Sequence, residues 1–280
     1  MLSRLYLWSI FMLLSLSLKS QYLDTRYNNS SKDMRLQGKV KQLKLTWYKS
    51  VKNGDSLKNE LELTILYKFN EAGNITEKIQ YRAKGDEAAR DIYGYENGRV
   101  VSYKAYSNGS KLPQYVVSCI TDLAKNTFTT RLTIPGLQGV HSTTVRTYNA
   151  KGQILSQITK ESGKITGTTK KYDPVKNTVR STSLDNSSYY DEVYDKNQFL
   201  IEAHYYKKSE DDAGTHFYTK YDAFGNEVES YYVNKKEGFT SPTDSTSYTY
   251  DSHNNWISKV SKSDFYTKKQ ERVIEYYSGK

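Results

Sequence analysis

The chain contains one cysteine, Cys119, and four prolines among its 280 residues. A single cysteine cannot form a disulfide within the molecule, so a disulfide-stapled fold is excluded. We expect Cys119 to be a small buried side chain. After residue 20 the chain also lacks long apolar runs and helical periodicity, which argues against a helical bundle and against further membrane-spanning helices.

The first twenty residues hold the one long apolar run. Arg4 supplies a positive charge, residues 5–18 are almost entirely apolar, and a polar segment begins at Lys19. This is the layout of a secretory signal peptide, and we predict cleavage after Ser20; an uncleaved N-terminal anchor is the alternative. The protein is therefore expected to be exported and to be periplasmic, associated with the outer membrane, or secreted. The polar residues 21–37 are predicted to be disordered.

Tyrosine is the most informative residue, with 27 copies in a chain whose mean hydropathy is -0.79. Aromatic residues in a polar background suit pleated, half-buried surfaces better than a thick core. The net charge is +10, but the basic residues are scattered beside acidic ones. This scatter indicates a solvated surface and disfavours a nucleic-acid interface.

One short pattern recurs about every 26 residues. It consists of an aromatic residue, usually an Asp or Asn, a tight turn with Gly or Asn, and an aliphatic residue that opens an alternating run. The aromatic positions are Phe69, Tyr95, Tyr148, Tyr172, Tyr194, Tyr221 and Tyr250. Residues 119–128 occupy the place of one further copy, so we count about eight.

Each copy predicts a chain reversal. The Asp or Asn side chain accepts bonds from nearby backbone, and Gly or Asn adopts positive φ at little cost. The alternating flanks predict a strand on either side. We therefore predict an all-β, elongated and twisted antiparallel β-meander, a solenoid-like array of about eight hairpin repeats over residues 38–280. Residues 39–47 and 271–277 are expected to be capping strands that cover its two ends.

The repeats resemble the YD repeats of the RHS family, and the chain is most similar to short secreted RHS-like proteins of the Bacteroidetes type. The residues that carry the resemblance are Tyr221–Asn226, Tyr148–Gly152, Tyr250–Trp256, the opening Gly38–Lys41 and the closing Glu271–Tyr276. Large RHS proteins wind such repeats into a shell around a toxin, closed by an Asp-Pro-x-Gly-Leu motif. Asp173-Pro174-Val175 departs from that motif, so the resemblance implies the repeat fold without the toxin-shell function.

The sequence predicts no catalytic residue, no metal site and no cofactor. His141, His204, His216 and His253 lie in different repeat units and share no ligand spacing with cysteines or acids. His204 and His216 could face each other across one hairpin, but a zinc site needs three or four converging ligands. The serines are not part of a nucleophile elbow. We therefore expect a non-enzyme; a glycan-processing enzyme would require two carboxylates that face each other across a cleft.

The tyrosines are the candidate binding residues. Neighbouring residues in a strand point to opposite faces, so each Tyr-Tyr pair must present one ring on each face of the sheet. Exposed rings with a hydroxyl group suit glycan or protein partners. The candidates are Tyr205, Tyr206, Tyr231, Tyr232 and Trp256. The alternative is a purely structural spacer, in which cross-strand rings only stabilise the sheet; the oligomeric state stays open.

Overall fold

The computed structural model describes residues 34–53, 56–197, 199–207, 214–264 and 266–278. Nineteen β-strands account for most of these described residues. The first nine are β1 (Val40–Asn53), β2 (Ser56–Phe69), β3 (Ile75–Arg82), β4 (Glu87–Glu96), β5 (Arg99–Ser107), β6 (Tyr115–Asp122), β7 (Thr127–Thr133), β8 (Ser142–Tyr148) and β9 (Ile154–Glu161). The others are β10 (Lys164–Asp173), β11 (Thr178–Ser183), β12 (Ser188–Tyr194), β13 (Leu200–Lys207), β14 (Thr215–Tyr221), β15 (Glu227–Asn234), β16 (Phe239–Thr240), β17 (Asp244–Tyr250), β18 (Trp256–Lys262) and β19 (Thr267–Tyr276).

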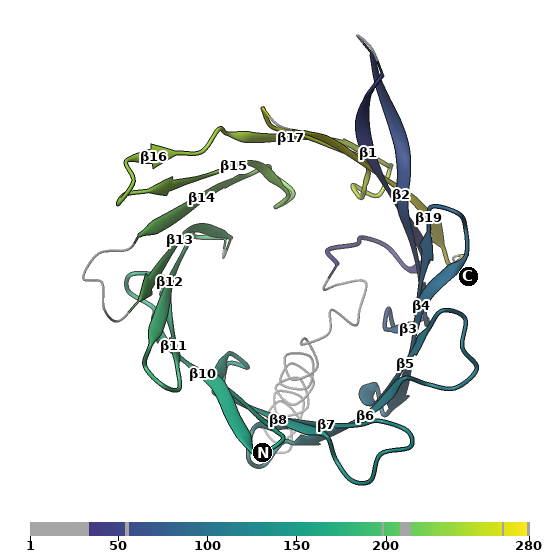
Figure 1. Ribbon diagram of the computed structural model, residues 1–280, viewed down its shortest axis with the longest axis vertical. Helices are drawn as coiled ribbons and strands as arrows, with labels where there is room; N and C mark the ends of the chain where they lie inside the picture. Colours follow the sequence, from purple (N-terminus) through teal and green to yellow (C-terminus); the bar gives the residue numbers. More distant parts are fainter. Residues whose placement is uncertain (1–33, 54–55, 198, 208–213, 265, 279–280) are drawn as a thin grey trace, which may run out of the picture.

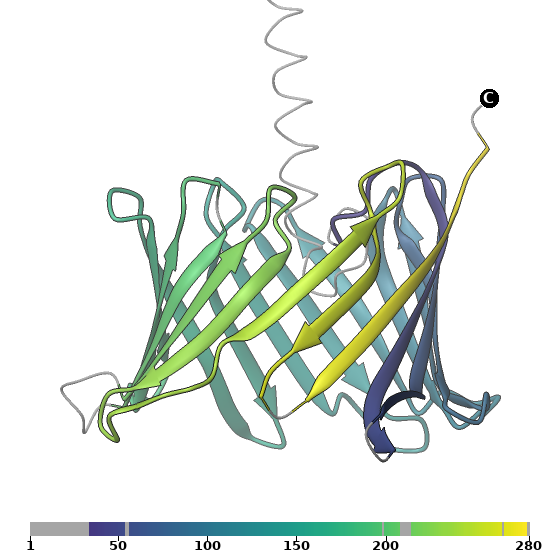
Figure 2. The ribbon, with the colours of Figure 1, turned by 90° about the horizontal axis from the view of Figure 1, so that it is seen from above.

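The strands form one closed antiparallel ring (Figure 1). Consecutive strands pair with each other along the chain, and β1 pairs with both β2 and β19. The two-residue strand β16 pairs with β15, while the ring itself continues from β15 to β17. The described residues therefore build an 18-stranded β-barrel with tilted strands (Figure 2).

The all-β prediction is confirmed, but the elongated, solenoid-like array is wrong. The two predicted capping strands pair with each other instead of covering separate ends: Leu43 lies opposite Ile274, and Leu45 lies opposite Arg272. An unpaired strand edge presents a row of unsatisfied backbone groups. Pairing the first strand with the last removes both edges at once, and the right-handed twist of the sheet brings them together.

The repeated turns all lie at one end of the barrel, here called the turn rim. Each predicted turn connects two paired strands, as between β2 and β3 or between β14 and β15. The segment 119–128 also contains such a turn, between β6 and β7. In Figure 1 these turns bend toward the inside of the ring, whereas loops at the opposite end, the loop rim, project outward after β5 and β7.

The turn after β14 shows how the local sequence reverses the chain. The Asp222 Oδ1 atom accepts hydrogen bonds from the backbone N–H groups of Phe224 at 2.9 Å and Asn226 at 2.8 Å. Gly225 has a φ of 79°, which a residue without Cβ adopts freely. A register shift between Lys220 and Tyr221 marks a β-bulge just before the turn. The same side-chain bonds recur at Asn70, Asn149, Asp195 and Asp251.

Tyrosine hydroxyl groups join several of the turns to neighbouring ones. The Tyr221 hydroxyl donates to the Leu200 carbonyl oxygen at 2.7 Å, and Leu200 is the first strand residue after the preceding turn. Related bonds, which we call tyrosine staples, run from Tyr95 to Ile75, from Tyr172 to Ile154, from Tyr276 to Asp251 and from Tyr277 to Phe69. A phenylalanine lacks the donor, so the staples explain the preference for tyrosine before these turns.

The register of the strands assigns side chains to an inner or an outer wall. The segment 34–39 lies inside the ring (Figure 1), and Leu36 packs against Leu43 and Phe69. Leu43 therefore faces inward. Directly paired residues share a face and successive residues alternate, so the pairings extend this assignment around the whole barrel.

The inner wall holds most of the buried apolar residues. One cluster contains Val100, Val117, Cys119, Phe128 and Tyr148, close to the turn rim. Cys119 is 6% exposed, which confirms the predicted small buried side chain. Because the turns bend inward, they shield these residues from solvent more than the rim of a simple open cylinder would.

The outer wall carries charged pairs at many positions. Lys68 lies 2.6 Å from Glu77, Lys220 lies 2.5 Å from Glu229, and an Arg180 nitrogen lies 2.6 Å from a carboxylate oxygen of Asp191. Such exposed pairs stabilise the fold by less than about 1 kcal/mol each.

The predicted signal peptide, residues 1–20, lies outside the described residues, as do residues 21–33 of the segment predicted to be disordered. The remaining residues of that segment, 34–37, lie against the inner wall, and Leu36 is 6% exposed. In the described part of the chain, no helix has the length and apolar character needed to cross a bilayer.

We predict that acid weakens the turn rim. Burial would raise the pKa of Asp251, but hydrogen bonds from the Tyr276 hydroxyl and from backbone N–H groups hold it below its usual value of 3.8; Asp222 behaves in the same way. A carboxyl with a lowered pKa stabilises the fold above about pH 4, and this contribution is lost as the pH falls further. Urea unfolding at pH 6 and pH 3 should show a smaller loss for the double variant Asp222→Asn/Asp251→Asn than for the wild type.

The variant Asp264→Asn, at an exposed position near the loop rim, is the matched control and should keep the wild-type difference. An unchanged pH dependence in the double variant would contradict the role assigned to these two carboxylates.

We also predict that Tyr221→Phe lowers the free energy of unfolding by about 1 kcal/mol, because the Leu200 carbonyl loses its donor while the ring remains. Tyr231→Phe should change it by less than about 0.5 kcal/mol, since that ring stacks on Tyr218 without a role in a staple. Denaturant unfolding of the two variants measures the difference. Equal effects would show that the staple adds nothing beyond ring packing.

Candidate functional site on the inner wall

The predicted binding residues divide between the two walls. Tyr205 and Tyr232 face inward, whereas their neighbours Tyr206 and Tyr231 face outward. The alternation therefore follows the prediction that each pair presents one ring per face. Trp256 also faces inward, at the turn rim, so the five residues do not share one surface.

The outward rings are engaged in stacks. Tyr206 lies parallel to Tyr189, with ring centroids 4.3 Å apart, and the Arg180 guanidinium covers Tyr189. Tyr231 stacks on Tyr218 at 4.9 Å. These contacts match the structural interpretation of the tyrosines, in which cross-strand ring pairs stabilise the sheet.

The inward rings form an exposed patch, which we call the inner aromatic wall. It consists of Tyr205, Phe217, Tyr232 and Phe239, with exposed fractions of 41%, 43%, 39% and 45%. Tyr232 lies between Phe217 and Phe239, with both centroid distances at 5.9 Å. The sequence analysis missed Phe217 and Phe239, because a single Phe in a strand gives no signal of the face on which it lies.

A groove of about 500 Å³ runs along this patch. Polar groups border the rings: the Tyr266 hydroxyl donates to Asp244 Oδ2 at 2.8 Å, and the groove is also lined by Ser230 and Ser241. The hydrogen bond to Asp244, together with burial, raises the pKa of Tyr266, which therefore keeps its proton. The groove thus combines flat apolar rings with fixed hydroxyl and carboxylate groups.

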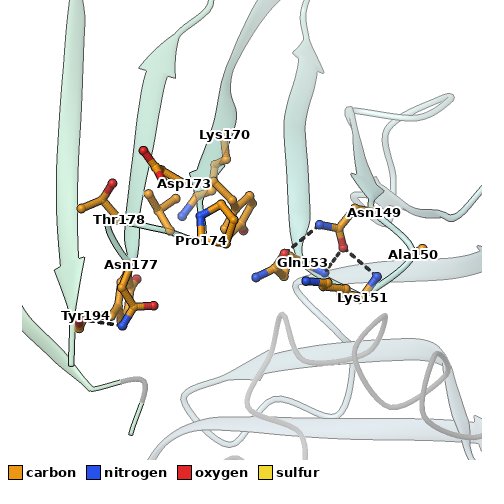
Figure 3. Close-up of a pocket in the computed structure, with 12 residues that line it drawn as sticks. Asn149, Ala150, Lys151, Gln153, Lys170, Asp173, Pro174, Asn177, Thr178 and Tyr194 are labelled. Atoms are coloured by element: carbon orange, nitrogen blue, oxygen red, sulfur yellow. Dashed lines mark hydrogen bonds between the residues drawn. The ribbon is translucent and has the colours of Figure 1, made fainter. Parts of the chain in front are cut away.

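A second groove of about 720 Å³ lies at the turn rim between the turns after β8 and β10 (Figure 3). Asn149 and Gln153 come from the first turn, where the Asn149 amide donates to Gln153 at 2.7 Å. Asp173 and Asn177 come from the second. Both grooves therefore offer hydrogen-bonding groups beside rings, since Tyr172 and Tyr194 also line this one.

Burial raises the pKa of Tyr172 and of Tyr194, and the Glu192 carboxylate adds to both effects. Both phenols therefore stay protonated. The Tyr172 hydroxyl is held by the Ile154 carbonyl at 3.0 Å. Lys170 lies 3.5 Å from Glu192, so its charge is partly balanced within the wall.

The segment 34–37 is attached to the inner side of the turn rim. Asn255 is 2% exposed and binds both backbone groups of Gln37: its Oδ1 accepts from Gln37 N at 2.7 Å, and its Nδ2 donates to Gln37 O at 2.9 Å. Arg35 donates to the Gly225 carbonyl and lies over the ring of Phe199. These bonds hold the segment against the wall and explain why Leu36 is buried.

Trp256, the last predicted binding residue, is covered by a cation. The Arg272 guanidinium lies 3.5 Å from its ring centroid. Burial lowers the pKa of Arg272 to about 10, although nearby tyrosines oppose the shift. This stacked pair leaves Trp256 less suited to ligand contact than Tyr232.

Among the described residues, one group of three side chains could hold a metal ion, and it lies on the outer wall. Glu202, His204 and His216 place their ligand atoms within 4.8 Å of one another. The two histidines face each other across the hairpin, as the sequence allowed, but Glu202 was not predicted as a third ligand.

No protein-family model matches the chain, and no curated protein matches it. A porin-like protein from Bacteroides uniformis superposes with a TM-score of 0.43 at 10% identity, over 85% of this chain and 98% of its own. A porin-like protein from Bacteroides vulgatus gives 0.36 at 12% identity, over 86% and 99%. The TcdB2-TccC3 structure gives 0.34 at 11% identity, over 83% of this chain and 16% of that chain.

At these TM-scores the likeness gives no basis for assigning a function. The comparisons do not support membership of the RHS family either, so the resemblance stays a prediction from the turn sequences.

We predict that Asn255→Ala releases the segment 34–37 from the wall, because both backbone groups of Gln37 lose their partner. Hydrogen–deuterium exchange should show faster exchange at the Gln37 amide. Asn226→Ala is the matched control, since Asn226 occupies the same place in the preceding turn and bonds Tyr250 instead. Equal exchange at Gln37 in both variants would mean that packing of Leu36, and not Asn255, holds the segment.

Proposed function

We propose that this protein is an exported, non-catalytic binding module that holds a glycan on the inner aromatic wall. The observation that supports the proposal most directly is the exposure of Tyr205, Phe217, Tyr232 and Phe239 on the inside of a closed barrel. Clustered exposed rings are unfavourable in water and commonly mark interaction sites.

The border of the patch favours a sugar over a purely apolar ligand. Sugar rings present flat C–H faces and a rim of hydroxyl groups. Phe217 and Tyr232 offer flat surfaces for the faces, while Asp244, Tyr266 and Ser230 offer partners for hydroxyl groups. The second groove repeats this combination with amides and tyrosines. The two grooves together suit an extended polymer better than a single small molecule.

The barrel has room for such a ligand. Barrels of 16–18 strands are wide enough to leave an aqueous interior. The outer wall also suits water, because charges such as those of Lys220, Glu229 and Glu271 would be costly against hydrocarbon. We therefore place the protein in the aqueous part of the cell envelope or outside the cell.

Ring stacks on the two walls supply the test. Tyr232→Ala and Phe217→Ala should weaken binding to a hit from a glycan array by at least about 10-fold, as expected for central aromatic contacts. Tyr189→Ala and Tyr206→Ala remove a ring stack from the outer wall at residues that do not line the groove, and they should leave the affinity within about 2-fold. Isothermal titration measures the affinities, and circular dichroism confirms that all four variants fold.

Two results would contradict the proposal. Equal losses on both walls would assign the effect to stability, and the absence of any glycan hit would favour the purely structural spacer. Binding of unfolded peptides that depends on Tyr232 would keep the site but replace the glycan with a protein ligand.

A further inference from the structure

A cluster of metal-ligand side chains lies on the outer wall, away from the inner aromatic wall. His204 on β13 is the register partner of His216 on β14, and their ring centroids are 4.2 Å apart. Glu202 precedes His204 by two residues and therefore faces the same side. Its Oε1 atom lies 2.7 Å from His204 Nε2. Two paired strands thus hold three ligand groups in one place.

The surroundings of the cluster fix the orientation of its side chains. His216 is 4% exposed, although it lies on the outer wall, so it is held by packing. The Tyr206 hydroxyl lies 3.4 Å from His204 Nδ1, where its oxygen can accept a hydrogen bond from a protonated Nδ1. A hydrogen bond from the second ring nitrogen is typical of metal-binding histidines, because it orients the ring so that Nε2 points toward the metal.

We propose that Glu202, His204 and His216 form a binding site for a divalent transition-metal ion of the zinc type. Two imidazole nitrogens and one carboxylate oxygen are ligands that zinc accepts, with bond lengths of about 2.0–2.2 Å. A tetrahedral ion with such bonds places its ligand atoms about 3.3 Å apart. The ligand atoms here lie within 4.8 Å of one another, so small side-chain rotations bring them to that separation.

Three protein ligands leave a fourth position for water or for a group from a partner. The ion would join β13 to β14 across the hairpin. It would therefore also stabilise the barrel wall, whether or not the inner wall binds a glycan.

Titration of the full chain, purified without a histidine tag, tests the site. The wild type should bind one Zn²⁺ per chain, and Co²⁺ should give the visible absorption bands of a four-coordinate site. His204→Gln, His216→Gln and Glu202→Gln should each reduce Zn²⁺ affinity by at least about 10-fold. His141→Gln is the matched control, because His141 also lies 3.0 Å from a glutamate, Glu161, but has no third ligand group in the cluster.

Circular dichroism distinguishes loss of the site from loss of the fold. If the variant at the buried His216 does not fold, the Glu202 variant still tests the site. The proposal is overturned if the folded wild type binds no Zn²⁺ at millimolar concentration, or if binding survives in His204→Gln and Glu202→Gln. A preference for Ca²⁺ over Zn²⁺ would also overturn it, since imidazole ligands disfavour calcium.

Discussion

The antiparallel pairing of β1 with β19 holds the barrel together as a ring. It joins strands more than 200 residues apart in sequence, from Val40 opposite Tyr276 to Lys49 opposite Lys268. Without it the sheet would have two free edges and would enclose no interior. Because the ring closes, each of its 18 strands has two hydrogen-bonded neighbours. The surroundings of each side chain then depend on the wall to which the register assigns it.

The turn rim is the part of the barrel in which local and long-range interactions coincide. At five of the turns the Asp or Asn organises its own turn through bonds to residues two and four positions ahead. The tyrosine staples then connect successive turns, so that bonds with short sequence separation run around the rim. The last of them, from Tyr277 to the Phe69 carbonyl, crosses the closure between the end and the beginning of the chain.

The two walls divide the aromatic residues into different roles. On the outer wall, rings such as Tyr206 and Tyr231 stack on neighbours among charged pairs, which suits a hydrated exterior. On the inner wall, Tyr232 and its neighbours remain exposed, and a groove of about 500 Å³ lies beside them. Binding on the inside and metal coordination on the outside would therefore act on separate surfaces, with β13 and β14 contributing to both.

The sequence by itself determined the strands, the turn positions and the alternation within each Tyr-Tyr pair, because Asx turns, positive φ at Gly or Asn and the two-residue period act over a few residues. Only the tertiary structure decided that β1 meets β19, that Tyr232 faces inward and Tyr231 outward, and that Glu202 joins the two histidines on the outer wall. These outcomes depend on the twist and register accumulated over 18 strands. A local sequence pattern spans a few residues and therefore does not specify them.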